Sequence, residues 1–199
     1  MNRDIAEIEQ KARKASNDIC KYTNVGDNKS HKEFSRIVDE IKAVCELWCG
    51  STYVGQRKSK NIENAFRCFF DQFMDFLISC KSSKYVFKRN FAKEVLYQGK
   101  IYRYLGYGAP SDCKKEAIVP EYDEIYVSWS KDLGNSYIES KLYGKITWIE
   151  AKIKSPYFGI DLENMGISRG KEREVVFPTL EDCVTNIKYM NCFRIFAKS

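Results

Sequence analysis

Two glutamates separated by one residue, Glu172 and Glu174, stand before a short apolar run in the segment KEREVVFP. If this segment is extended, the two side chains share one face of a strand, about 6–7 Å apart along the chain. Paired carboxylates on one face can stabilise developing positive charge and move a proton. Two glutamates with this spacing also occur as solvated charges on an edge strand. The choice between the two interpretations therefore depends on the other polar residues of the chain.

Two further strand-like segments carry polar residues where a strand would normally bury apolar ones. In KIYRYL, Arg103 stands among aromatic and aliphatic residues. In EIYVSWS, Ser128 and Ser130 share a face while Trp129 points the other way. A guanidinium offers positive charge and several hydrogen-bond donors to a phosphate or a ribose, and a hydroxyl can orient a carboxylate.

Arginine, then Ser-x-Ser, then Glu-x-Glu, in this order and each on or near a strand, resembles the mono-ADP-ribosyltransferases of the arginine–serine–glutamate class. This class includes toxins, phage modification enzymes and ectoenzymes. Arg103 precedes Ser128 by 25 residues and Ser128 precedes Glu174 by 46, and the aliphatic run and proline of VVFP also fit the family pattern. SWS departs from the usual Ser-Thr-Ser only at its central position. The resemblance covers roughly residues 95–199.

This resemblance implies that NAD is the substrate. Glu174 would stabilise the positive character of the nicotinamide ribose and contact its hydroxyl. Ser128 would hydrogen-bond Glu174 and fix its direction, and Glu172 would position or deprotonate the acceptor.

The remaining NAD contacts that the resemblance implies come from the same motifs. Arg103 would bind NAD through a phosphate or a ribose, the backbone of Tyr104 would meet the nicotinamide amide, and Ser130 would complete the serine motif. The loop 155–170 resembles the target-recognition segment of the family. Its aromatic residues, Phe158 and the neighbouring Tyr157, are candidates for stacking on nicotinamide or on the acceptor, and core packing fits either residue equally well.

The activity that follows is NAD-dependent mono-ADP-ribosyl transfer to a macromolecule with release of nicotinamide, in a toxin, toxin–antitoxin or phage-defence role. Glu-x-Glu favours a protein arginine as acceptor, while an RNA or DNA base stays open. One alternative is an NAD glycohydrolase, whose only product would be free ADP-ribose. Another is a catalytically idle module that binds a protein partner, such as an antitoxin or chaperone on the N-terminal helices.

Periodicity places these motifs in an α+β fold. Apolar residues at three- and four-residue steps predict three helices, over about 5–19, 30–50 and 61–80, and SHKE at Ser30 is a capping box. Short β-type runs follow at 100–105, 124–130, 145–153, 172–177 and 191–198. We therefore expect an N-terminal helical region, residues 1–95, packed on or beside a catalytic domain, residues 96–199. The resemblance implies that this domain has a mostly antiparallel two-sheet core.

The net charge of +6 belongs to the first half of the chain. Residues 1–100 carry 19 lysines and arginines against 13 acidic residues, whereas residues 101–199 carry 14 of each. Two basic segments with aromatic residues, TYVGQRKSK (52–60) and KYVFKRN (84–90), have a composition that suits nucleic acid. Solvated helix faces and surface loops explain the same features.

Several other site classes are not supported. The eight cysteines lack zinc spacing, and His31 is the only histidine, so the cysteines are interpreted as reduced core residues and metal binding is not expected. GYGAPS lacks the third glycine of a dinucleotide fingerprint and is predicted to be a turn. No apolar run could span a bilayer and the first residues are charged, so we expect a cytoplasmic protein without a membrane partner.

Overall fold

The computed structural model of the protein describes residues 5–25, 30–52, 60–107, 126–132, 146–167, 173–178 and 181–191. The chain divides into two compact units, Met1–Val95 and Leu96–Ser199. Helices make up the described part of the first unit and strands dominate the second, so the α+β class predicted from the sequence is confirmed. None of the described helices is long and apolar enough to cross a membrane.

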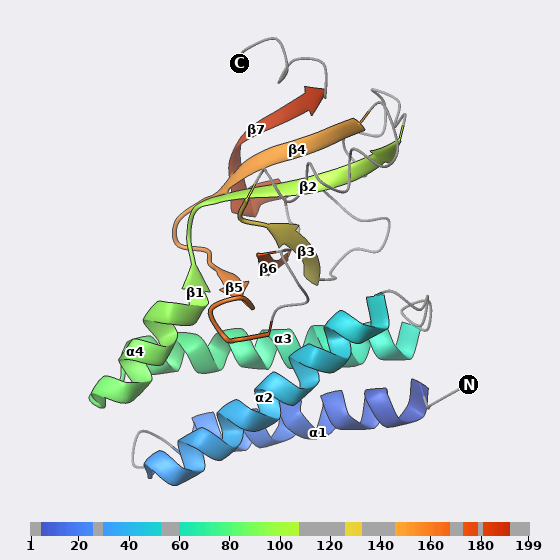
Figure 1. Cartoon of the computed structure of the whole chain (residues 1–199). Coiled ribbons are helices and arrows are strands. Elements are labelled where there is room, and N and C mark those ends of the chain that lie inside the picture. The colour runs from blue at the N-terminus through green and yellow to red at the C-terminus, as the bar shows by residue number, and fades with distance from the viewer. Residues whose placement is uncertain are drawn as a thin grey trace. The chain divides into compact units, whose positions relative to one another are not determined.

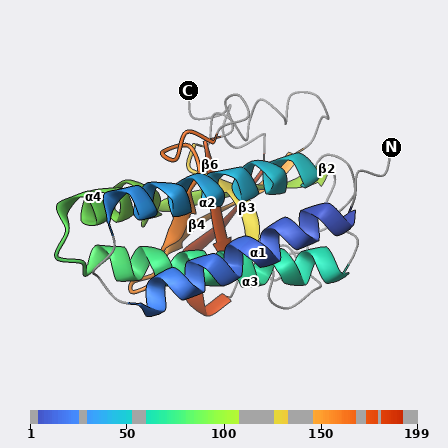
Figure 2. The same ribbon diagram turned by 90° about the horizontal axis from the view of Figure 1, so that it is seen from below.

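The first unit contains the helices α1 (Ile5–Asn24), α2 (His31–Thr52), α3 (Lys60–Lys81) and α4 (Val86–Val95). The Ser30 hydroxyl accepts a hydrogen bond from the amide of Glu33 at 3.3 Å, as the capping box predicts, and α2 begins there. Within this unit α1 contacts both α2 and α3, and Figure 2 shows α1 crossing α3. Rings of Phe34, Phe76 and Phe91 join α2, α3 and α4 in one aromatic core.

The segment 84–90, whose composition suits nucleic acid, leads into α4 and contributes to this core. Lys88 is only 3 % exposed, and its ammonium lies 5.2 Å from the ring centroid of Tyr22 and 5.3 Å from that of Tyr85. Its charge is therefore directed at aromatic faces within the unit. Most of the other basic segment, residues 53–59, lies outside the described residues.

The second unit is built on one antiparallel sheet, shown in Figure 1, in the order β1-β5-β6-β3-β2-β4-β7. Its strands are β1 (Leu96–Tyr97), β2 (Lys100–Tyr107), β3 (Tyr126–Ser130), β4 (Ile146–Ile153), β5 (Gly159–Asp161), β6 (Glu174–Pro178) and β7 (Val184–Asn191), and a short 3-10 helix, Glu181–Cys183, precedes β7. The last strand thus starts earlier than the run predicted at 191–198, most of which lies outside the described residues.

The expectation of a two-sheet core is wrong for the strands that the structure describes, because a single residue pair makes the sheet continuous. Strands β3 and β6 pair over five positions and β2 and β4 over six, whereas β2 and β3 pair only at Tyr102 and Ser130. Two well-paired groups of strands therefore meet at one narrow junction, and Ser128, Ser130, Glu174 and Arg103 lie around it.

One apolar cluster of this unit, which we call the core, lies on one face of the sheet, and Val176 and Ile160, both 0 % exposed, are buried on the other face. The core contains Ile101, Trp129, Ile149, Ala151, Ile153, Val175, Phe177, Cys183 and Val184, all 7 % exposed or less. Alternate residues of β3 and β6, among them Ser128 and Glu174, point to the opposite face. The alternation that buries Trp129 therefore also determines where the serines and the glutamate point.

Candidate active site

A serine and a glutamate that lie 46 residues apart in the sequence are in direct contact on the face opposite the core. Ser128 Oγ donates a hydrogen bond to Glu174 Oε1 at 2.5 Å. The register explains this contact, because Ser130 is the partner of Glu174 and Ser128 the partner of Val176, which makes Ser128 and Glu174 diagonal neighbours. Glu174 is 9 % exposed, so its carboxylate is held in a partly buried site.

Ser130 shares this face, but its hydroxyl is engaged locally. It accepts from the amide of Asp132 at 3.0 Å and donates to the carbonyl of Asp132 at 2.9 Å. These two bonds close a turn at the end of β3, a common use of a serine side chain. In this structure Ser130 therefore shapes the backbone beside the Ser128–Glu174 pair rather than extending the pair.

Arg103 lies at the same junction and on the other face. Its neighbour Tyr102 pairs with Ser130, so the side chain of Arg103 follows the alternation of Ile101 towards the core. Its guanidinium carbon is 6.0 Å from the centroid of the Trp129 ring, and burial lowers the pKa of Arg103. The structure therefore brings Ser128 and Glu174 together and does not bring the Arg103 guanidinium to them.

The positions of the other two predicted NAD contacts, Tyr104 and Phe158, follow from the pairing of the strands. The backbone of Tyr104 is paired with Trp148 of β4, two residues beyond the last described pair between β2 and β3. Phe158 is half-buried and precedes β5, whose register with β6 places it towards Pro178. Glu174 is at the opposite end of β6, roughly 13 Å away by strand rise. The aromatic residues of the loop are thus distant from the carboxylate.

The shared face predicted for the two glutamates required an extended backbone between them, and Arg173 is not extended. Strand β6 begins at Glu174, and the preceding Arg173 has a φ of 44°, in the left-handed region. Because residue 173 is not extended, alternation along a strand cannot place the side chains of Glu172 and Glu174 on one face. Glu172 itself lies outside the described residues.

Charged residues that the sequence analysis did not select surround this turn. Lys131 Nζ lies 2.6 Å from Asp161 Oδ2 and 2.7 Å from Glu163 Oε2. Arg173 contacts the same Glu163 oxygen through Nε and Asp132 Oδ2 through Nη1, both at 3.2 Å. We call these five residues the ion-pair network. The only sequence signal was that Lys131 and Asp132 directly follow the serine motif and Arg173 separates the two glutamates.

Three of these groups have pKa values that reflect the network, and one of them is Arg173, whose pKa is raised by its hydrogen bond to Glu163. Hydrogen bonding to Lys131, and then to Arg173, holds the pKa of Glu163 below its usual value. For Lys131, burial alone would lower the pKa, but the hydrogen bonds to Asp161 and Glu163 together outweigh burial, and the net pKa is raised. Lys131 and Glu163 are therefore charged at neutral pH.

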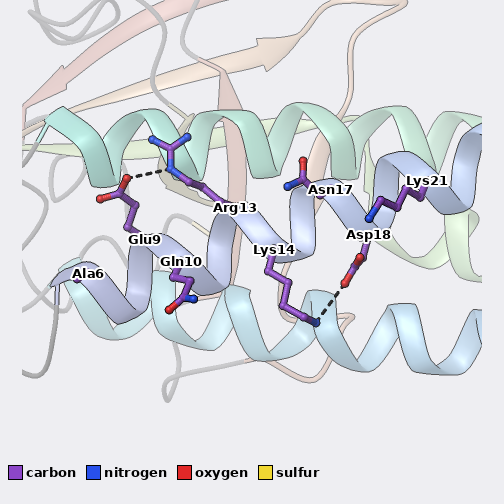
Figure 3. Close-up of a pocket in the computed structure, with 8 residues that line it drawn as sticks. All are labelled: Ala6, Glu9, Gln10, Arg13, Lys14, Asn17, Asp18 and Lys21. Atoms are coloured by element: carbon purple, nitrogen blue, oxygen red, sulfur yellow. Dashed lines mark hydrogen bonds and ion pairs between the residues drawn. The ribbon is translucent and has the colours of Figure 1, made fainter.

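Other candidate sites offer little chemistry. A depression along α1 is lined by residues of that helix alone, and Figure 3 shows that its charged residues include the neighbouring pairs Arg13–Glu9 and Lys14–Asp18. Such i,i+4 pairs are typical of a solvated helix face. Across the described residues, no group of three or more His, Cys, Asp or Glu side chains is arranged to hold a metal ion.

Comparison with family models, with curated proteins and with solved structures gave no match for this chain. Its function therefore has to be inferred from the chemistry of the residues around the Ser128–Glu174 pair.

Proposed function

We propose that the protein is an NAD-dependent mono-ADP-ribosyltransferase with its active site at the Ser128–Glu174 pair. The observation that carries this proposal is the 2.5 Å hydrogen bond from Ser128 Oγ to Glu174 Oε1, which fixes a partly buried carboxylate on the face opposite the core. The ordered arginine, serine and glutamate motifs of the sequence give the substrate class.

The reaction needs a carboxylate in this state. Cleavage of the bond between nicotinamide and C1′ of the ribose sends the electron pair to the nicotinamide ring, which leaves as a neutral molecule, and leaves positive character on the ribose. A preorganised carboxylate stabilises that charge as it develops. The acceptor atom then forms a new bond to C1′ and loses a proton to a base. Glu174 supplies the electrostatic stabilisation, and Ser128 limits the directions in which its carboxylate can point.

Two roles in this proposal rest on the resemblance alone. Glu172 is assigned to the acceptor, where it would take up the proton released during attack. Arg103 is assigned to a phosphate or ribose of NAD, although its guanidinium carbon lies 6.0 Å from the Trp129 ring centroid.

Transfer of label from NAD tests the proposal. The protein is incubated with a cell lysate and with NAD that carries a label on its adenosine moiety, and labelled macromolecules are measured. We expect the wild-type protein to transfer label and Glu174→Gln to lose at least 100-fold of this activity, on the order of the effect of removing one electrostatic contact from an active site.

A matched variant controls for the loss of a buried strand glutamate. Glu150 lies on β4, is 8 % exposed against 9 % for Glu174, and contacts Lys100 at 3.2 Å. Glu150→Gln should keep the transfer activity. Equal activity of wild type and Glu174→Gln would overturn the proposal. Free ADP-ribose as the sole labelled product would replace it with NAD glycohydrolase activity.

A further inference from the structure

The ion-pair network is directly connected to Glu174 through the backbone. Arg173, the residue before Glu174, offers its carbonyl to the amide of Lys131 at 3.1 Å, and the carbonyl of Glu174 accepts from the amide of Leu162 at 2.9 Å. The side chains of Lys131 and Arg173 meet at one atom, Glu163 Oε2. The end of β3, the turn after β5 and the start of β6 are thereby tied together.

One end of this network is buried and the other is accessible. The Asp161 side chain is 2 % exposed and that of Lys131 10 %, and Asp161 also accepts from the amide of Asn164 at 3.0 Å through its second oxygen. Removing one partner of such a pair would leave an uncompensated buried charge. The Arg173 side chain is 45 % exposed, so its contacts can be altered with far less effect on folding.

Arg173 holds a backbone conformation that an arginine does not adopt by preference. A φ of 44° at a residue with a side chain is unfavourable by about 1–3 kcal/mol and persists only when the surroundings impose it. Here the guanidinium is held from two sides, by Asp132 and Glu163, and the carbonyl is held by Lys131. The contacts of the Arg173 side chain thus stabilise the turn from which Glu174 enters β6.

We propose that Arg173 is a positioning residue, whose forked contact with Asp132 and Glu163 holds the turn that directs the Glu174 carboxylate onto Ser128. The effect of this positioning on catalysis rests on the proposed transferase function. Arg173 acts through the backbone of Glu174 and not on NAD. A carboxylate that wanders by even 1 Å loses much of its effect on a transition state, up to about 100-fold in rate.

Arg173→Lys tests this role because it keeps the charge and removes the fork. A lysine ammonium is a point charge and cannot reproduce the geometry of Nε and Nη1 towards two different carboxylates. The purified full-length variant is assayed for release of nicotinamide from NAD. We expect kcat to fall about 10- to 100-fold, KM for NAD to stay within about twofold and the melting temperature to change little.

A second readout does not depend on activity. The titration of the Glu174 side-chain carboxyl is followed by carbon-13 NMR in the wild type and in the variant. Loss of a well-directed hydrogen bond from Ser128 to the charged carboxylate should shift the Glu174 midpoint upward in Arg173→Lys. Arg36→Lys is the matched control, because Arg36 of α2 contacts Glu40 at 2.6 Å through Nη1. It should leave both readouts unchanged.

The outcomes separate this inference from the proposed function. Wild-type turnover and a wild-type Glu174 midpoint in Arg173→Lys would overturn the positioning role. If the wild-type protein releases no nicotinamide, the titration of Glu174 still tests the positioning role of Arg173. A shifted midpoint then supports positioning of Glu174 and removes only the transferase function, whereas an unshifted midpoint overturns the inference as well.

Discussion

At the scale of single residues, the contact between Ser128 and Glu174 is the feature that the serine and glutamate motifs led us to look for, and their side chains meet across β3 and β6. The motif spacing could suggest this contact because both residues lie on strands, where alternation limits each side chain to two directions. It could not reveal the left-handed turn at Arg173, because an arginine gives no local signal for a positive φ.

Arg103 is the residue at which the resemblance and the structure suggest different roles. If Arg103 binds NAD, Arg103→Lys should raise KM for NAD about tenfold with a smaller effect on kcat, because a contact shared by ground state and transition state is lost. We expect this result from steady-state nicotinamide release. An unchanged KM together with a lower melting temperature would instead assign Arg103 to its cation–π contact with Trp129.

The depressed pKa of Glu163 predicts a pH dependence of stability. Because its folded pKa is lower than its unfolded value of about 4.3, Glu163 contributes stability that is complete above that pH and is lost as the pH falls through the folded pKa. Urea unfolding of the wild type and of Glu163→Gln is compared at pH 7 and at about pH 3. The difference in unfolding free energy between the two should shrink in acid, and a difference independent of pH would contradict this role.

At the scale of elements, sequence patterns that span several neighbouring residues predict the helices, whereas a single pairing between two strands cannot be predicted from such patterns. The cap at Ser30 and the apolar periodicity predict α2 and α3 closely, since each depends on residues near in sequence. The start of α4 at Val86 was missed because its basic side chains resemble those of a surface segment. The continuity of the sheet depends on one long-range pair, Tyr102 with Ser130, which no local pattern encodes.

The short strand β5 reaches β6 closely at Gly159, and this predicts a sensitive position. A Cβ on Gly159 would lie 2.5 Å from Val175 Cγ1 and 3.2 Å from Ile153 Cδ1. Gly159→Ala should therefore lower the unfolding free energy by about 1–3 kcal/mol, measured by urea denaturation.

A second substitution shows whether this loss comes from the contact. Val175→Ala removes the nearest atom, so the double variant Gly159→Ala/Val175→Ala should be more stable than the sum of the two single effects implies, by about 1 kcal/mol or more. Gly166→Ala is the control, because nothing lies within 4 Å there and its φ of 76° alone disfavours alanine, so Val175→Ala should not rescue it. Strict additivity at Gly159 would contradict close packing.

At the scale of the whole molecule, the uneven charge raises the question of the acceptor. All of the excess positive charge lies in residues 1–100, and one lysine of that half, Lys88, is buried against aromatic rings. Since Glu-x-Glu favours a guanidinium acceptor by the resemblance, we expect the label transferred from NAD to be removed by protease and retained after nuclease treatment. Label that is lost with nuclease would assign the acceptor to RNA or DNA and give the basic half a docking role.

The most direct measurement of the central claim is the release of nicotinamide from NAD by the purified protein, without any acceptor, for the wild type, Ser128→Ala and Glu174→Gln. If the hydrogen-bonded carboxylate stabilises the ribose cation, the wild type should release nicotinamide slowly and Glu174→Gln should not. Ser128→Ala should lose about 10- to 100-fold in rate, the effect of one hydrogen bond to a charged group. Equal rates for all three proteins, or no release and no transfer by the wild type, would contradict the account.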